Sequence, residues 1–112
     1  MLYTYKAKCI NVVDGDTFDF TVDLGFHLVK QIRVRLKGID TPEMRASTEA
    51  ERHHAREAKA FVERLMLDKS VTITTEKAPG IYGRFSAQVI LGDNEDLADK
   101  LSEAKLAKLE EY

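Results

Sequence analysis

The chain alternates strictly between apolar and polar side chains along the stretch Phe18-Asp19-Phe20-Thr21-Val22-Asp23-Leu24. This period of two residues predicts a β-strand with one buried face, formed by the apolar side chains. The segment Ile32–Lys37 alternates in the same way, so its apolar side chains are also expected in the core. Its opposite face would then carry three cations, at Arg33, Arg35 and Lys37.

Three other segments are rich in β-forming residues and predict further strands, at Tyr3–Val13, Val71–Thr75 and Phe85–Val89. Asp14-Gly15 is a turn signal, so the first two strands are expected to form a hairpin. Thr41-Pro42 ends the third strand, because a residue that precedes proline is driven away from the helical region of backbone space.

Two segments predict helices. Thr48-Glu49-Ala50-Glu51 has the spacing of a helix capping box, and apolar residues then recur at steps of three and four to about Leu67. Leu97, Leu101 and Ala104 indicate a last helix. The order of three strands, a helix, two strands and a helix is typical of the OB-fold, a five-stranded Greek-key barrel. We therefore expect an α+β fold that is mainly β, with an antiparallel barrel.

Length and composition favour an ordered protein. The chain has 112 residues, which predicts one domain over residues 1–112, and 44% of them are apolar. No apolar run exceeds three residues, so a membrane span is excluded and no membrane partner is expected. No signal peptide is visible, which predicts a cytoplasmic or phage-encoded intracellular protein, while secretion of a trimmed precursor stays open. The single cysteine, Cys9, excludes an internal disulfide.

The net charge is −2 and is unevenly distributed. Residues 93–112 contain seven acidic and three basic residues, a net charge of −4, so residues 1–92 carry +2. The global charge thus gives no support for nucleic-acid binding, and any such function must depend on a local patch.

Four carboxylates lie near predicted strand ends rather than on a helix face, at Asp14, Asp16, Asp40 and Glu43. Neighbouring strands of a meander would bring these ends together, where the carboxylates repel one another unless a cation holds them. A hard cation such as Ca²⁺ accepts carboxylate, carbonyl and water oxygens. The alternative is that Asp14-Gly15 is only a hairpin turn and Asp40-Thr41-Pro42 only a strand terminator.

Arg35 and Arg84 lie close to these clusters in the expected fold. A guanidinium offers paired donors that match phosphate oxygens, and two arginines beside a metal and a carboxylate would suit phosphodiester hydrolysis. The alternative is a surface cation on an exposed strand face, which fully suits Arg33 and Lys37.

Together these residues resemble the motifs of the staphylococcal nuclease (thermonuclease) family. That family has an Asp-Gly-Asp-Thr hairpin, an arginine followed five residues later by Asp-Thr-Pro-Glu, and a Tyr-Gly-Arg turn. The chain contains all three in that order, as Asp14–Thr17, Arg35 with Asp40–Glu43, and Tyr82–Arg84. One motif alone is a weak signal, whereas three in order identify the chain as a member of the family.

The resemblance implies a Ca²⁺-dependent, sugar-non-specific endonuclease that hydrolyses DNA and RNA and leaves 3′-phosphate ends. It also implies a preference for single strands, and we expect a monomer. Carried over by motif, the roles are as follows: Asp16, Asp40 and the Thr41 carbonyl as Ca²⁺ ligands, Asp14 as a water-mediated carboxylate, Glu43 as the group that positions or deprotonates water, Arg35 and Arg84 as phosphate clamps, and Tyr82 as a nucleotide contact.

Several features depart from the family pattern. The isoelectric point of about 5.9 predicts weak non-specific affinity for nucleic acid. Lys105 occupies a position where the family commonly has glycine, and Tyr112 is the one aromatic near the place of the family's C-terminal nucleotide contact. A nuclease-like module that binds nucleic acid or protein without catalysis is the alternative function, and the retained catalytic side chains argue against it. We interpret His53-His54 as part of a solvated helix face and Cys9 as a small buried apolar residue.

Overall fold

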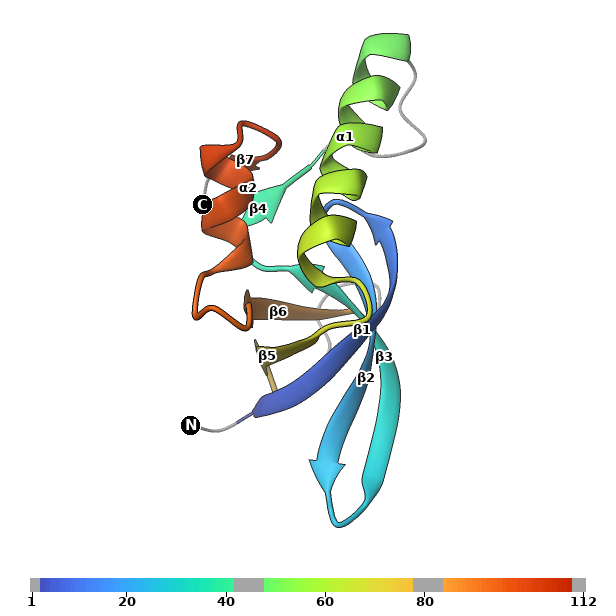
Figure 1. Cartoon of the computed structure of the whole chain (residues 1–112), viewed down its shortest axis with the longest axis vertical. Coiled ribbons are helices and arrows are strands. Elements are labelled where there is room, and N and C mark those ends of the chain that lie inside the picture. The colour runs from blue at the N-terminus through green and yellow to red at the C-terminus, as the bar shows by residue number, and fades with distance from the viewer. Residues whose placement is uncertain (1–2, 42–47, 78–83, 110–112) are drawn as a thin grey trace.

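The computed structural model describes residues 3–41, 48–77 and 84–109, and these form a closed barrel with two helices beside it (Figure 1). The barrel strands are β1 (Thr4–Asp14), β2 (Thr17–Gly25), β3 (Leu28–Leu36), β5 (Ser70–Thr75) and β6 (Phe85–Ile90). Their order is β1-β2-β3-β6-β5, and β5 pairs with β1 to close the barrel. Helix α1 (Glu49–Met66) follows β3, and helix α2 (Leu97–Glu103) follows β6. The expected α+β barrel is confirmed.

One strand pairing differs from the expected antiparallel barrel. Strands β3 and β6 run parallel, with Arg35 opposite Ser86 and Leu36 opposite Ala87. A parallel pair needs a long crossover connection, and α1 with β5 supplies it here. The barrel is therefore mixed, and its parallel seam brings the end of β3 beside the start of β6.

A small second sheet lies outside the barrel. Strand β4 (Ile39–Asp40) pairs with β7 (Lys108–Leu109), with Ile39 opposite Leu109. The sequence pattern predicted neither strand, because two residues are too few to show a period. This pairing ties the segment after β3 to the C-terminal segment.

Apolar side chains from every layer meet in one core. Phe18, Phe20 and Val22 point into the barrel, and the two phenylalanine rings make an edge contact at 6.0 Å. Helix α1 buries Ala55, Ala58, Val62 and Met66, while α2 buries Leu97 and Leu101. The alternating pattern predicted a buried face through Leu24, but Leu24 is exposed because β2 and β3 extend beyond the barrel.

The ends of the two helices explain two sequence features. Thr48 caps α1 through its hydroxyl, which accepts a hydrogen bond from the Glu51 amide at 3.1 Å, as the capping box predicted. Lys105 follows α2 with φ +60°, and the amides of Lys105 and Leu106 donate to the carbonyls of Ser102 and Leu101. This is a Schellman cap, which favours glycine at the left-handed position. A glycine in place of Lys105 would adopt this backbone conformation at lower cost.

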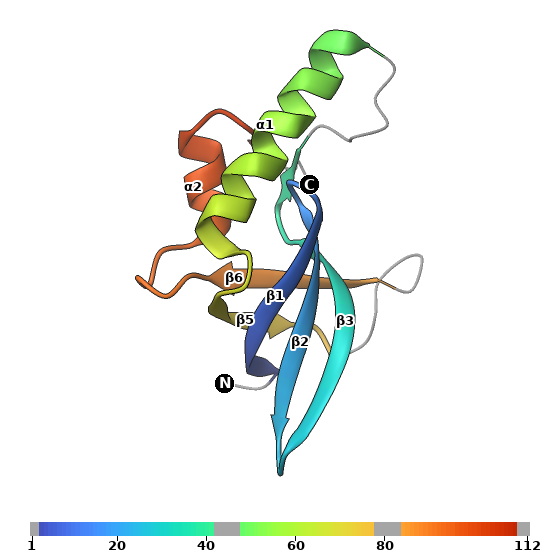
Figure 2. The same ribbon diagram turned by 45° about the vertical axis from the view of Figure 1, so that its right-hand side comes forward.

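The hairpin of β2 and β3 projects from the barrel and forms one end of an elongated molecule measuring 46 × 28 × 21 Å (Figure 2). The opposite end of the long axis is formed by α1 (Figure 1). Strand β2 therefore connects two different surroundings, the barrel beneath α1 and a free tip. Among the described segments, no helix is long and apolar enough to cross a membrane.

Candidate active site

The turn between β1 and β2 places Asp16 in a buried position. Asp14 pairs with Thr17, so Gly15 and Asp16 are the two residues of the turn. The Asp16 carbonyl accepts a 2.7 Å hydrogen bond from the Leu36 amide at the end of β3, and Asp16 is only 7% exposed. The main chain thus fixes where this carboxylate lies.

Both carboxylate oxygens of Asp16 have a hydrogen-bond donor. Oδ1 accepts from the Thr17 hydroxyl and Oδ2 accepts from the Thr41 amide, each at 3.1 Å. Burying a carboxylate is costly unless such donors replace water. The Thr41 bond also links the turn to the segment that follows β4, so two of the sequence motifs meet at Asp16.

Arg35 adds a positive charge to the same site. Its Nη2 lies 3.9 Å from Asp16 Oδ2 and donates to the Ile39 carbonyl at 3.4 Å. The guanidinium is therefore held between the hairpin turn and the residues that lead to Thr41. Arg35 and the two clusters that contain Asp16 and Thr41 thus lie together, as expected, while the roles given to these residues stay predictions.

Arg33 lies two residues earlier on the same strand and has a different environment. It makes a two-point contact with Asp19, from Nε to Oδ1 at 2.7 Å and from Nη2 to Oδ2 at 3.1 Å. The Arg33 hydrogen bond lowers the pKa of Asp19, and Asp19 raises the pKa of Arg33. Arg33 thus has an exposed acidic partner, as expected for a surface cation, whereas Arg35, on the same strand face, lies beside the buried carboxylate.

Gly15 is required by close packing rather than by its backbone angle. A Cβ atom on Gly15 would lie 2.8 Å from the Ala58 Cβ of α1 and 3.0 Å from two side-chain atoms of Thr41. Real Cβ atoms essentially never approach so closely, and Ala58 is on a buried helix face. The turn therefore sits directly against α1 and Thr41, and a glycine allows this approach.

Thr41 contributes an oxygen that no described residue satisfies. Its Oγ1 is buried without a hydrogen-bond partner, while its amide donates to Asp16. A buried hydroxyl without a partner is costly. Beside a buried carboxylate, it is an oxygen that a hard cation or a bound water can use. The donor set at this point, all oxygen, fits Ca²⁺.

The remaining predicted residues are placed only in part. Asp14 ends β1, and Arg84 is exposed and directly precedes β6. Ser86 is opposite Arg35, so Arg84 lies two residues, or roughly 7 Å, from that level of the seam. The side chain of Asp40 and the residues Glu43, Tyr82 and Tyr112 lie outside the described part of the structure. Within the described ranges, no three acidic, histidine or cysteine side chains are grouped to hold a metal.

Sequence reasoning missed some parts of the site and judged others correctly. Thr17 and Ala58 were given no role, and only the Asp-Gly-Asp-Thr motif itself could have indicated Thr17. His53 lies on an exposed helix face and pairs with Glu57, as interpreted, but His54 is half-buried and its Nε2 lies 3.2 Å from the Lys105 carbonyl oxygen. Burial raises the pKa of the Cys9 thiol to about 11, so this thiol is a buried apolar group as predicted.

The mixed five-stranded barrel, with a helix after β3 and a C-terminal helix, defines an OB-fold-like α+β domain. The model of the staphylococcal nuclease homologue family matches residues 33–112, so the chain belongs to this family. A thermonuclease of Staphylococcus hyicus is 34% identical over 110 residues, which cover 97% of this chain. The chain spans 60% of the length of that relative.

Proposed function

We propose that this protein is a Ca²⁺-dependent endonuclease that hydrolyses the phosphodiester bonds of DNA and RNA and leaves 3′-phosphate ends. The observation that carries the proposal is the buried Asp16 carboxylate, held by Thr17 and Thr41 with Arg35 beside it. Membership of the nuclease family and the relative named thermonuclease support it.

In this proposal Asp16, Asp40 and the Thr41 carbonyl hold the cation, and Asp14 contributes through water. Asp16 has one oxygen bonded to Thr17 and the other to Thr41, and each carboxylate oxygen keeps a second lone pair. A bound Ca²⁺ would supply positive charge against the reacting phosphate. The Thr41 hydroxyl, which has no hydrogen-bond partner among the described residues, offers one more oxygen beside the proposed cation.

The protein side chains then divide the remaining work. Arg35 and Arg84 donate to the phosphate oxygens, because a guanidinium matches them in pairs. Glu43 positions the attacking water or accepts its proton. Tyr82 and Tyr112 contact the nucleotide. Arg35 is the member of this set that the described structure fixes most closely, through Ile39 and Asp16.

Of its DNA and RNA substrates the protein prefers single strands, and it acts as a monomer in an intracellular compartment. The negative net charge predicts weak non-specific affinity, since neutralised phosphates supply most of such binding. Substrate binding therefore depends on contacts at the site itself rather than on a broad basic surface.

Digestion of a single-stranded DNA oligonucleotide tests this function. Wild-type protein is incubated with Ca²⁺ and, in parallel, with excess chelator, and the product ends are identified by mass spectrometry. We expect cleavage with Ca²⁺ only and 3′-phosphate products. Binding of the oligonucleotide without cleavage under any condition would instead support a binding module.

A further inference from the structure

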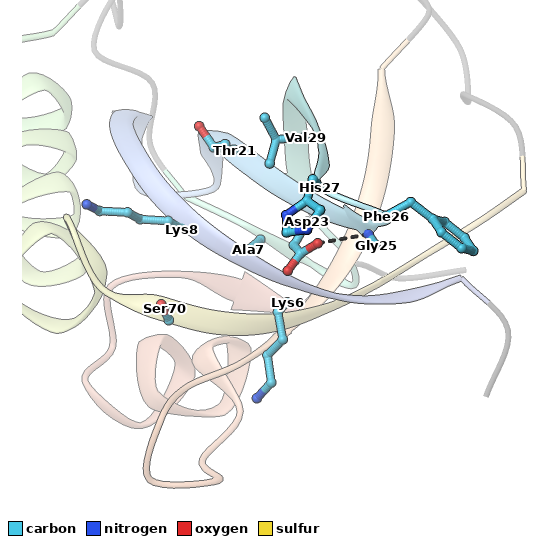
Figure 3. A pocket seen from close by; sticks show the side chains of 10 residues that line it. All are labelled: Lys6, Ala7, Lys8, Thr21, Asp23, Gly25, Phe26, His27, Val29 and Ser70. Atoms are coloured by element: carbon cyan, nitrogen blue, oxygen red, sulfur yellow. Dashed lines mark hydrogen bonds between the residues drawn. The ribbon is translucent and has the colours of Figure 1, made fainter.

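The tip of the β2–β3 hairpin is apolar, strained and exposed. Among the described residues, five large hydrophobic side chains are exposed, and four of them lie here, at Leu24, Phe26, Leu28 and Val29. Phe26 is 96% exposed. Its ring points away from the barrel (Figure 3). This hairpin forms one end of the molecule (Figure 1), and the four side chains are exposed there.

The backbone of the tip makes this exposure more informative. Phe26 and His27 both have positive φ, 55° and 62°, and form a two-residue turn that favours Asn-Gly. A left-handed conformation costs about 1–2 kcal/mol for each residue with a Cβ atom. The chain thus places its most exposed aromatic ring where an asparagine would be more stable. Such strain points to a function for the side chain.

Cations lie behind the tip at one level of the sheet. Lys30 is opposite Val22, and Val22 is opposite Ala7, which lies between Lys6 and Lys8. This level is four residues from Phe26 along either strand, or about 13 Å. The charged residues of segments 4–9 and 20–31 are three lysines and one aspartate, so this half of the barrel carries +2 in a chain of net charge −2.

A hollow of about 640 Å³ opens between the tip and two of these lysines, Lys6 and Lys8, while Lys30 lies on the opposite face of the hairpin (Figure 3). Lys6, Lys8, Thr21, Ser70 and His27 line it, together with Val29. Asp23 also lines it, and its carboxylate accepts a 2.8 Å hydrogen bond from the Gly25 amide, which shapes the turn. The hollow therefore combines two ammonium and two hydroxyl groups with one carboxylate, and its ammonium groups suit a phosphate-bearing headgroup.

We propose that this hairpin tip docks on an anionic phospholipid surface, with Phe26 and its aliphatic neighbours in the interface and the three lysines at the level of the headgroup phosphates. Apolar groups of interfacial proteins enter about 5–10 Å, which matches an apolar tip with cations about 13 Å behind it. The sequence expectation of no membrane partner considered only spanning segments, and a tip of this kind is outside that test.

Two other occupants fit the tip less well. Four side chains cover only a fraction of the about 800 Å² that each partner buries in a standard protein interface. Single-stranded nucleic acid stacks its bases on flat rings, and beside Phe26 the tip offers mainly the aliphatic side chains of Leu24, Leu28 and Val29, which give no such platform. An anionic lipid surface uses both the aliphatic side chains and the lysines.

Vesicle co-sedimentation at low salt tests the proposal, using phosphatidylcholine vesicles with and without phosphatidylglycerol. We expect wild-type protein to bind the anionic vesicles. Phe26→Asn should bind them with an affinity at least about tenfold lower. Each of Lys6→Gln, Lys8→Gln and Lys30→Gln should weaken binding about fivefold. Phe26→Asn suits the turn, so a thermal melt should show an intact fold.

Ile10→Thr is the matched control, since Ile10 is the fifth exposed apolar residue and lies outside the tip. It should bind anionic vesicles as wild type does. Absence of wild-type binding, or equal binding by Phe26→Asn, would overturn the proposal. So would a Phe26→Asn variant that binds vesicles as wild type does but binds a fluorescent single-stranded oligonucleotide more weakly. That result would assign the tip to nucleic acid. Vesicle binding is read without turnover, so the outcome is independent of the nuclease proposal.

Discussion

Strand β2 joins two turns of equal length and opposite character. The turn at Gly15-Asp16 is buried against α1, and its carboxylate has donors on both oxygens. The turn at Phe26-His27 has positive φ at both residues and an aromatic ring that is almost fully exposed. The first turn is specified by contacts with distant parts of the chain, whereas the second keeps residues that its own geometry disfavours. The first turn therefore depends on packing and hydrogen bonds with distant residues, whereas the second carries a local backbone cost.

The largest effect is expected at the guanidinium beside the buried turn. Arg35→Lys should lower turnover on single-stranded DNA by about 10²–10³, because a point charge cannot replace a paired donor beside Asp16. Arg33→Lys, two residues away on the same strand face, should change turnover little. Equal losses in steady-state kinetics would mean that strand charge in general, rather than a contact at this turn, supports catalysis.

Gly15 and Gly25 should be needed for different reasons, Gly15 for close packing and Gly25 for its backbone angle. Gly15→Ala should destabilise the fold by about 1–3 kcal/mol, because its Cβ would overlap Ala58 and Thr41. Gly25→Ala meets no atom within 4 Å, and its φ of +80° alone should cost about 1 kcal/mol. Urea unfolding measures both. A smaller loss for Gly15→Ala than for Gly25→Ala would contradict the close packing of the first turn.

The strained turn should allow an increase in stability. Replacing Phe26-His27 by Asn-Gly should raise the free energy of unfolding by about 1 kcal/mol, because these residues adopt positive φ at low cost. Thermal unfolding followed by circular dichroism measures the change, with turnover on DNA as a control that should stay at the wild-type value. A loss of stability would show that the tip residues make contacts that favour the fold.

The smallest effect is expected midway between the turns, at the Asp19–Arg33 pair. The pKa of Asp19 is lowered in the folded protein, so the pair stabilises the fold above the unfolded pKa of about 3.9 and loses this contribution as the pH falls through the folded pKa. Both side chains are partly exposed, so Asp19→Asn should cost about 0.5 kcal/mol at pH 7. Denaturation at pH 7 and at pH 2 should show the difference between wild type and variant shrink on acidification. A difference that grows would contradict the sign.

Local signals predicted much of this structure. The helix expected from about Thr48 to Leu67 is observed from Glu49 to Met66 with Thr48 as its cap, because capping is decided within a few residues. The motifs likewise predicted that Asp16, Arg35 and Thr41 meet. Asp40 belongs to β4, a two-residue strand that no local pattern predicted.

Features that depend on contacts between distant residues could not be predicted from the sequence. Whether β6 runs parallel to β3 depends on the path of the chain between them, which no local pattern contains. The need for glycine at Gly15 comes from Ala58, which lies 43 residues away in sequence. Alternation through Leu24 showed which face each side chain takes, but not that the pairing of β2 with β1 ends at Val22, before Leu24.

The central claim is that the catalytic end of β2 is the buried turn. Two aspartates test it, since Asp16 lies in that turn and Asp23 shapes the exposed one by accepting from Gly25. The measurement is the initial rate of single-stranded DNA cleavage at saturating Ca²⁺ for Asp16→Asn and Asp23→Asn, with melts to establish folding. We predict a loss of about 10²–10³ for Asp16→Asn and less than about twofold for Asp23→Asn. Wild-type cleavage by folded Asp16→Asn protein would contradict the claim.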